Sequence, residues 1–186
     1  MIDKTELEDA TRRTLLKGLL AGGVMTTIPG TAMAGRLSLP HYKVSLVNAH
    51  TNEKFEGVYR IGNRYLPDAF RKINQFMRDF RTGDVYTMDP HLLDILASLQ
   101  VRTNTGKPLE LISGYRSPKT NAMLRKASTG VAKNSYHMKG RAADIHLPGY
   151  STKELRNIAR ALKVGGVGYY PRSDFIHVDT GDVRTW

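Results

Sequence analysis

Apolar and polar positions alternate regularly in residues 43–59. Val44 and Leu46 alternate with polar side chains before the polar stretch 48–53, and the alternation resumes at Phe55. A period of two is typical of a half-buried strand, and a short polar segment between two such runs is typical of a turn. These residues are therefore predicted to form a β-hairpin.

Two later segments have helical spacing instead. From residue 66 to residue 80, apolar side chains recur at steps of three and four residues: Leu66, Phe70, Ile73, Met77 and Phe80. Asp89 and Pro90 then supply an N-cap and a first-turn proline to a second apolar stripe, which contains Leu92, Leu93, Leu96 and Leu99. Both stripes are predicted to be helices that pack against the core.

The middle of the chain places a short apolar run directly before a turn. Residues 108–113 are predicted to form a buried strand, so Arg116 lies at the end of a strand. Ser117 and Pro118 can begin a third helix as its N-cap and first residue.

Strand patterns gather in the last third of the chain. Residues 141–147, 167–170 and 175–180 are predicted to be strands. Between the first two, Ser151 and Glu154 form a capping box for a helix that ends near residue 162. Helices come early and strands cluster late, which favours an α+β fold.

Composition adds a basic charge. The chain has 28 lysine and arginine residues and 17 aspartate and glutamate residues, a net charge of +11. Residues 1–34 contain equal numbers of basic and acidic side chains, so the remainder carries the whole excess. Such a surface attracts polyanions, and nucleic acid, anionic lipid and the bacterial wall all qualify. Charge alone does not choose among them.

Cysteine is absent from the chain. This excludes disulfides, thiol nucleophiles, cysteine metal ligands and a lipid anchor on an N-terminal cysteine. Hydrophobic residues make up 40% of the sequence, which is the composition of an ordinary folded protein. Any metal must therefore be held by histidine and carboxylate side chains.

The N-terminal region resembles a twin-arginine export signal. Arg12 and Arg13 precede two leucines and a weakly apolar stretch, and small residues occupy 32–34 around Met33, where signal peptidase requires them. The apolar stretch is too short to act as a stable membrane anchor. We therefore expect a signal peptide at 1–34 and a periplasmic location.

Cleavage at that point would leave residues 35–186, about 150 residues, the usual size of one globular domain. We expect this segment to be a single catalytic domain. Nucleic acid is not expected as a partner, because the export signal argues against it and the chain lacks an aromatic-basic recognition motif.

Two histidines and one aspartate carry the clearest chemical signal. His137 and Asp144 lie in the segment 135–144, and His177 follows about thirty residues later. Two histidines and a carboxylate form a known catalytic zinc set that leaves one coordination position for water. Zinc lowers the pKa of that water, which lets an enzyme without a nucleophilic side chain attack an amide near neutral pH.

Strand alternation brings these side chains to defined faces. Asp144 shares its face with His146, and His177 shares its face with Phe175 and Asp179. Two adjacent strands could therefore converge their ligands. His146 is expected outside the first coordination shell, because two same-face neighbours would strain a tetrahedral site.

The segment around the first two candidates resembles the signature Ser-x-His-x-x-Gly-x-Ala-x-Asp of the M15-type zinc metallopeptidases. All its fixed positions are present: Ser135, His137, Gly140, Ala142 and Asp144. The resemblance extends through residues 113–117, residues 165–171 and the terminal Trp186, and points to the murein endopeptidase type. It implies a hedgehog-like or D-alanyl-D-alanine carboxypeptidase-like fold with a small antiparallel sheet and packed helices.

The resemblance also implies roles for individual residues. One zinc ion per chain would be held by His137, Asp144 and His177. Arg116 would stabilise the oxyanion that develops during attack. Ser135 and Tyr136 are candidates for contact with a substrate carboxylate, although they could instead complete a turn.

The catalytic base has two candidates. The family places an acidic residue three positions before the last histidine, and Asp174 occupies that place here. Asp179 is an alternative, either as base or as a partner behind the metal ligands. Phe175 stands where related enzymes have a histidine, which excludes a histidine base from that position.

The resemblance implies hydrolysis of peptide cross-links in peptidoglycan, at bonds from D-alanine to mesodiaminopimelate and also between two diaminopimelates. A carboxypeptidase that trims terminal D-alanine and a non-catalytic wall-binding module are the alternatives. The expected partner is peptidoglycan, and the protein is expected to be a monomer without a stable membrane anchor.

Overall fold

The computed structural model describes residues 39–128 and 130–186, so the predicted export signal lies outside the described part. Its strands are β1 (His41–Asn48), β2 (Lys54–Ile61), β3 (Arg64–Tyr65), β4 (Leu109–Ser113), β5 (Ala142–His146), β6 (Gly166–Tyr170), β7 (Phe175–Asp179) and β8 (Arg184–Thr185). Its helices are α2 (Pro67–Phe76), α3 (Pro90–Thr103), α4 (Pro118–Ala127) and α5 (Thr152–Leu162), with the 3-10 helices η1 (Tyr136–Lys139) and η2 (Pro171–Ser173).

All the strands join one sheet in the order β3-β2-β1-β4-β5-β7-β6-β8. Most neighbours are antiparallel, but β1 pairs with β4, and β6 with β8, in parallel. The α+β class is confirmed, and the expected small antiparallel sheet is corrected to a mixed sheet of eight strands. The long connection from β1 to β4 passes through α2 and α3, which gives the chain room to return in the same direction.

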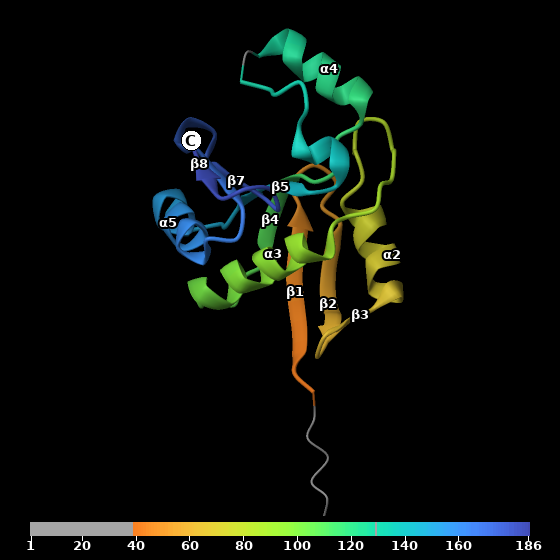
Figure 1. Cartoon of the computed structure of the whole chain (residues 1–186), viewed down its shortest axis with the longest axis vertical. Coiled ribbons are helices and arrows are strands. Elements are labelled where there is room, and N and C mark those ends of the chain that lie inside the picture. Colours follow the sequence, from red (N-terminus) through yellow and green to blue (C-terminus); the bar gives the residue numbers. More distant parts are fainter. Residues whose placement is uncertain (1–38, 129) are drawn as a thin grey trace, which may run out of the picture. The chain divides into compact units, whose positions relative to one another are not determined.

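Three helices cover one face of the sheet (Figure 1). Helix α2 packs on β2, α3 crosses β1, and α5 packs on β6 and β7. Alternate strand residues, such as Leu46, Leu111, Ile145 and Val178, point into this layer and are buried there. Removing this apolar area from water is the main stabilising contribution to the fold.

Most predicted elements are confirmed, and their caps explain their bounds. The hairpin forms from β1 and β2. The N-caps of α3, α4 and α5 are Asp89, Ser117 and Ser151, and each side chain accepts a hydrogen bond from a first-turn amide.

The helix predicted from residue 66 to residue 80 is too long, because α2 ends at Phe76. The carbonyl of Met77 accepts a hydrogen bond from the amide of Tyr115, at 2.7 Å. The chain then turns, and the ring of Phe80 stacks on His50 with 3.9 Å between ring centroids. A tertiary contact therefore ends a pattern that continues in the sequence.

The opposite face of β5, β7 and β6 carries the polar residues. Because side chains alternate along a strand, Asp144 and His177 lie on the face away from Ile145 and Val178. Within the part of the chain that the structure describes, no helix has the length and apolar content needed to cross a bilayer.

Candidate metal and catalytic site

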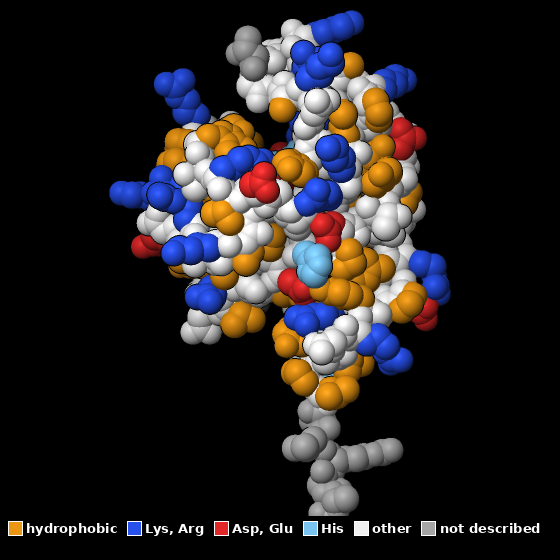
Figure 2. All heavy atoms as spheres, viewed as in Figure 1, with side chains coloured by type: hydrophobic (Ala, Val, Ile, Leu, Met, Phe, Trp, Pro, Cys, Tyr) orange, Lys and Arg blue, Asp and Glu red, His pale blue; other side chains and the backbone are white. Residues whose placement is uncertain are grey.

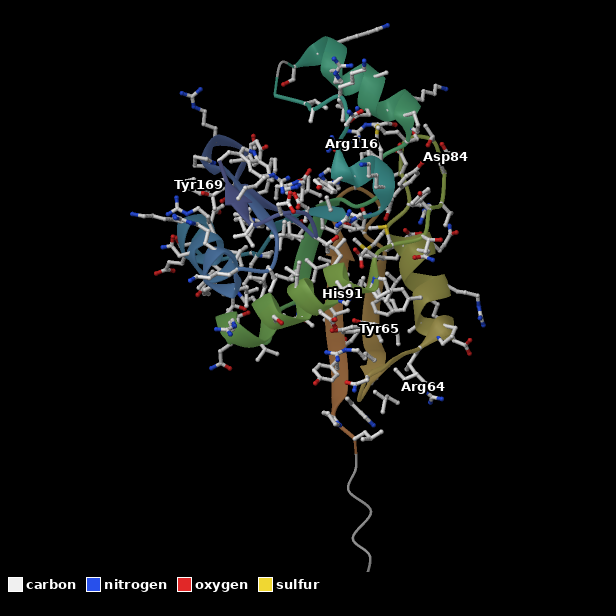
Figure 3. All side chains as sticks on the ribbon, in the orientation of Figure 1. Arg64, Tyr65, Asp84, His91, Arg116 and Tyr169 are labelled. Carbon is white, nitrogen blue, oxygen red and sulfur yellow. The ribbon has the colours of Figure 1, made fainter. Side chains whose placement is uncertain are left out.

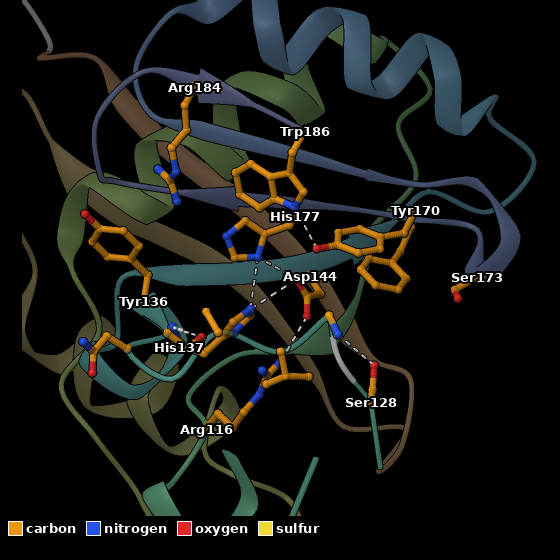
Figure 4. Close-up of a pocket in the computed structure, with 16 residues that line it drawn as sticks. Arg116, Ser128, Tyr136, His137, Asp144, Tyr170, Ser173, His177, Arg184 and Trp186 are labelled. Atoms are coloured by element: carbon orange, nitrogen blue, oxygen red, sulfur yellow. Dashed lines mark hydrogen bonds and ion pairs between the residues drawn. The ribbon is translucent and has the colours of Figure 1, made fainter. Parts of the chain in front are cut away.

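A pocket of about 440 Å³ opens on this polar face. One wall is the segment from residue 130 to η1, which follows α4, and the other is formed by residues from β6, η2, β7 and β8. Figure 2 shows the surface hollowed between these two parts, and Figure 4 shows the lining side chains. The pocket contains all three predicted metal ligands, together with Arg116.

The three predicted ligands converge at the floor of this pocket. Asp144 and His177 are direct partners across the antiparallel pair β5–β7, and η1 brings His137 beside them. One oxygen of Asp144, Oδ1, lies 3.2 Å from His137 Nε2 and 2.9 Å from His177 Nδ1. The two ring nitrogens are 3.1 Å apart. One ligand atom from each residue lies within 4.8 Å of the others, so the group can hold a metal ion.

The outer partners of the two histidines determine which nitrogens face the pocket. His137 Nδ1 donates to the carbonyl of Gly114 at 2.8 Å, so its Nε2 directs a lone pair inward. His177 Nε2 donates to Asp179 Oδ2 at 2.9 Å, which turns its Nδ1 inward. Two lone pairs and a carboxylate oxygen therefore face one another, an arrangement that a cation satisfies and that fits the donor set of zinc.

Burial and these contacts also shift the ionisation of the ligands. Burial lowers the pKa of His137, which favours the neutral imidazole that a metal requires. Burial acts to raise the pKa of Asp144, but His137 and His177 outweigh it and hold that pKa well below its usual range. For His177, burial lowers the pKa while hydrogen bonds with Asp144 and Asp179 raise it, with a net increase.

Asp179 lies behind His177, and its side chain is fully buried. Both its oxygens face the guanidinium of Arg184, at 3.0 and 2.7 Å, and Oδ1 also accepts from the amides of Gly166 and Gly181. Its acceptor positions are therefore occupied. Of the two roles open for Asp179, this geometry favours the partner behind the metal ligand.

Asp174 is not brought together with the ligand candidates. It ends η2 in the left-handed conformation, with φ of 52°, and its side chain is mostly exposed. Its carboxylate accepts from the hydroxyl of Thr152, and its backbone carbonyl accepts from His146 Nδ1 at 2.8 Å. It does not line the pocket. His146 lies outside the ligand group, as expected.

Arg116 enters the pocket from the loop after β4 (Figure 3). The amide of Ser117 donates to the buried Asp79 at 2.9 Å, which anchors this loop from behind. The side chain of Arg116 is 12% exposed, and its guanidinium lies 3.4 Å from Asp144 Oδ2. Its Nε has no partner among the described residues. Burial lowers its pKa, Asp144 opposes that effect, and the group stays cationic.

Ser135 and Tyr136 border the same pocket in different ways. The hydroxyl of Ser135 accepts from the amide of His137 at 3.3 Å, so it caps η1 and completes a turn. The ring of Tyr136 lies beneath the cations of Arg141 and Arg184, at 5.0 and 5.2 Å. Of these two side chains, that of Ser135 is used in the cap, whereas the hydroxyl of Tyr136 has no hydrogen-bond partner among the described residues.

The sequence patterns did not identify the wall formed by Tyr170, Arg184 and Trp186. The tyrosine pair at 169–170 fits either a stacking platform or ordinary strand packing. Strand alternation could have placed Tyr170 at the site. Gly168 pairs with His177, and Tyr170, two residues further along β6, lies on the same face. Trp186 arrives there through β8, an element too short to be recognised by pattern.

Residues 38–186 match the family model described as "Peptidoglycan L,D-endopeptidase MepK". The Escherichia coli (strain K12) protein of that name is 44% identical over 181 residues, covering 96% of this chain and 98% of the relative. A Haemophilus influenzae protein named "Probable peptidoglycan L,D-endopeptidase MepK" is 42% identical over 177 residues, covering 91% and 94%. The chain therefore belongs to the M15-type peptidase family of peptidoglycan L,D-endopeptidase MepK.

Proposed function

We propose that this protein is a zinc-dependent endopeptidase that hydrolyses peptide cross-links in peptidoglycan. The observation that carries the proposal is the convergence of His137, Asp144 and His177 at the floor of an open pocket. Family membership and the relatives' printed names support the substrate class.

The proposed ligands are His137 Nε2, Asp144 and His177 Nδ1. A zinc ion held there would supply Lewis acidity, which makes water nucleophilic near neutral pH. Gly114 and Asp179 keep the two imidazoles in the required tautomers. Arg116 lies beside the ligands, 3.4 Å from Asp144, and its guanidinium would bind the carbonyl oxygen as negative charge develops on it.

Asp174 is the general base predicted from the sequence. Asp174 would have to leave Thr152 to reach the pocket, so its position gives the predicted role no support. Asp174→Asn tests it directly. A base role requires a loss of about a hundredfold to ten-thousandfold in turnover with zinc retained. Near wild-type turnover would remove Asp174 from the mechanism.

The relatives' names specify an L,D bond, which bears on the preferred cross-link. A bond between two diaminopimelates joins an L centre to a D centre, whereas a bond from D-alanine to diaminopimelate joins two D centres. The proposed preference is therefore the diaminopimelate–diaminopimelate bond. The basic excess of the chain suits a substrate rich in carboxylates.

Digestion of purified sacculi tests the function. The protein should split muropeptide dimers, a chelator should stop the reaction, and added zinc should restore it. Shortened monomers with intact dimers would identify a carboxypeptidase. Binding to sacculi without any product would identify a wall-binding module. Full activity after complete metal removal would contradict the metallopeptidase proposal.

We also propose export to the periplasm through the twin-arginine pathway, from the pattern at residues 12–34. Replacing both Arg12 and Arg13 with lysine should retain the precursor in the cytoplasm, because that machinery reads the arginine pair. Fractionation followed by immunoblotting measures this. An undiminished periplasmic amount would contradict the proposal.

A further inference from the structure

Tyr170 and Trp186 form a fixed pair on the pocket wall opposite Arg116. The indole Nε1 of Trp186 donates to the hydroxyl oxygen of Tyr170 at 2.9 Å. Figure 4 shows the tyrosine hydroxyl directed toward Asp144 and His177. Both rings line the same pocket as the predicted metal ligands.

The direction of this hydrogen bond determines what the tyrosine can do. An indole N–H can only donate, whereas a phenol can accept and also donate its own hydrogen. The tyrosine oxygen therefore accepts from Trp186, and its hydrogen remains available. Among the described residues this hydroxyl has no hydrogen-bond partner besides Trp186, so its hydrogen can be donated to a group bound in the pocket.

Both rings are held by packing as well as by this bond. The ring of Tyr170 stacks on Phe175, with 4.6 Å between centroids. The backbone of Trp186 exchanges two hydrogen bonds with β6, and its ring lies 5.3 Å from that of His177. A Cβ at Gly168 would approach the indole to 2.8 Å, so only glycine leaves room for it.

Arg116 faces the same space from the other wall. Tyr170 and Arg116 both line this pocket, from β6 and from the loop after β4. A group between the two walls would thus meet a cation on one side and a neutral donor on the other. This is the composition of a site that stabilises a developing oxyanion.

We infer that Tyr170 is a catalytic residue that donates a hydrogen bond to the carbonyl oxygen of the scissile amide, and that Trp186 is a positioning residue that acts through Tyr170. The inference rests on the proposed peptidase function. As water attacks the amide carbon, an electron pair moves onto the carbonyl oxygen. The tyrosine hydrogen bond strengthens as that charge grows, while the proton stays on the phenol.

The test uses steady-state kinetics of the zinc-loaded protein on a purified cross-linked muropeptide dimer. Tyr170→Phe keeps the stacked ring and removes only the hydroxyl. Loss of one oxyanion donor should lower kcat by about a hundredfold, with KM and zinc content unchanged. Tyr169→Phe is the matched control, because its ring packs against the core and beside Arg156, and kcat should stay at the wild-type value.

Trp186→Phe keeps an aromatic ring and removes the indole donor. It should lower kcat less than Tyr170→Phe does, and the double variant should match Tyr170→Phe alone, because the tryptophan acts through the tyrosine. Independent, multiplying losses would overturn the positioning role.

Two results would overturn the role of Tyr170. One is a kcat of Tyr170→Phe equal to that of the wild type, when the wild type is active. The other is a raised KM at constant kcat, which would place the hydroxyl in substrate binding. A wild type that holds zinc but cleaves no dimer would overturn the proposed function itself, and this inference with it.

Discussion

Two polar clusters interrupt the apolar interior, and they differ in how their carboxylates are satisfied. In one cluster, Asp94 on α3 accepts hydrogen bonds from the hydroxyls of Tyr59 and Tyr65, at 2.8 and 2.5 Å. Arg60 approaches the same carboxylate to 3.1 Å. Figure 3 shows Tyr65 beside His91, next to this cluster. Donors of hydrogen bonds therefore surround one acceptor.

In the other cluster, Asp144 meets the inward nitrogens of His137 and His177. The N–H groups of the two rings point away from the pocket: His137 Nδ1 donates to the carbonyl of Gly114, and His177 Nε2 donates to Asp179. Here acceptors face acceptors, and the group is completed by a cation. A carboxylate that faces two hydroxyl donors and a cation favours a structural role, whereas converging lone pairs indicate a ligand site.

The largest expected effect separates the clusters by metal content. His137→Ala should lose the bound zinc and reduce peptidase activity to background, because a third of the proposed ligand set is removed. Elemental analysis and muropeptide release measure the two effects. His91→Ala, a histidine beside the Asp94 cluster, is the matched control and should keep both. If His137→Ala still bound one zinc per chain and remained active, the assignment of this cluster as the metal site would be contradicted.

The next effect concerns the residue behind the metal ligand. Asp179→Asn should weaken zinc affinity by about tenfold to a hundredfold, because the carboxylate orients His177 and increases its basicity. Competition with a chromophoric chelator measures the affinity. Asp94→Asn serves as the control and should leave it unchanged. Equal zinc affinities in wild type and Asp179→Asn would exclude the orienting role.

Asp94→Asn should instead act on stability. The amide replaces one of the two acceptor oxygens with a donor and removes the charge that faces Arg60, so the free energy of unfolding should fall by about 1–3 kcal/mol. Urea titration measures the change, and turnover per folded molecule should stay constant. A variant of unchanged stability with impaired turnover would reverse the assignment of the two clusters.

The smallest effect is a pH dependence in the Asp94 cluster. Burial, followed by the hydrogen bond to Asp94, raises the pKa of Tyr65 to about 12. A raised pKa of an acid means that the folded state prefers the neutral phenol. The associated stabilisation is complete below the ordinary tyrosine pKa of about 10 and is lost as pH rises toward 12.

Tyr65→Phe should therefore lose less stability than wild type between those pH values. Urea titrations at several alkaline pH values measure the slope. Tyr86→Phe, whose ring stacks on Tyr115 away from Asp94, is the control. Identical slopes for Tyr65→Phe and wild type would show that this phenol does not report on the cluster.

The sequence by itself determined the regular elements and the identity of the candidate ligands. Periodicity and caps predicted the hairpin, α3, α4, α5 and the strands around the site, because these signals are local. The alternation of β5 and β7 also placed Asp144 and His177 on convergent faces, and their pairing confirms this.

Only the tertiary structure decided what surrounds those ligands. Spacing suggested Asp174 as a base, but the left-handed residue at the end of η2 turns its carboxylate toward Thr152. Asp179 hydrogen-bonds His177, and Arg184 and the amides of Gly166 and Gly181 occupy its other acceptor positions. Trp186 reaches the site through the pairing of β8 with β6. These positions depend on contacts between segments far apart in the chain, and local patterns carry no distances between such segments.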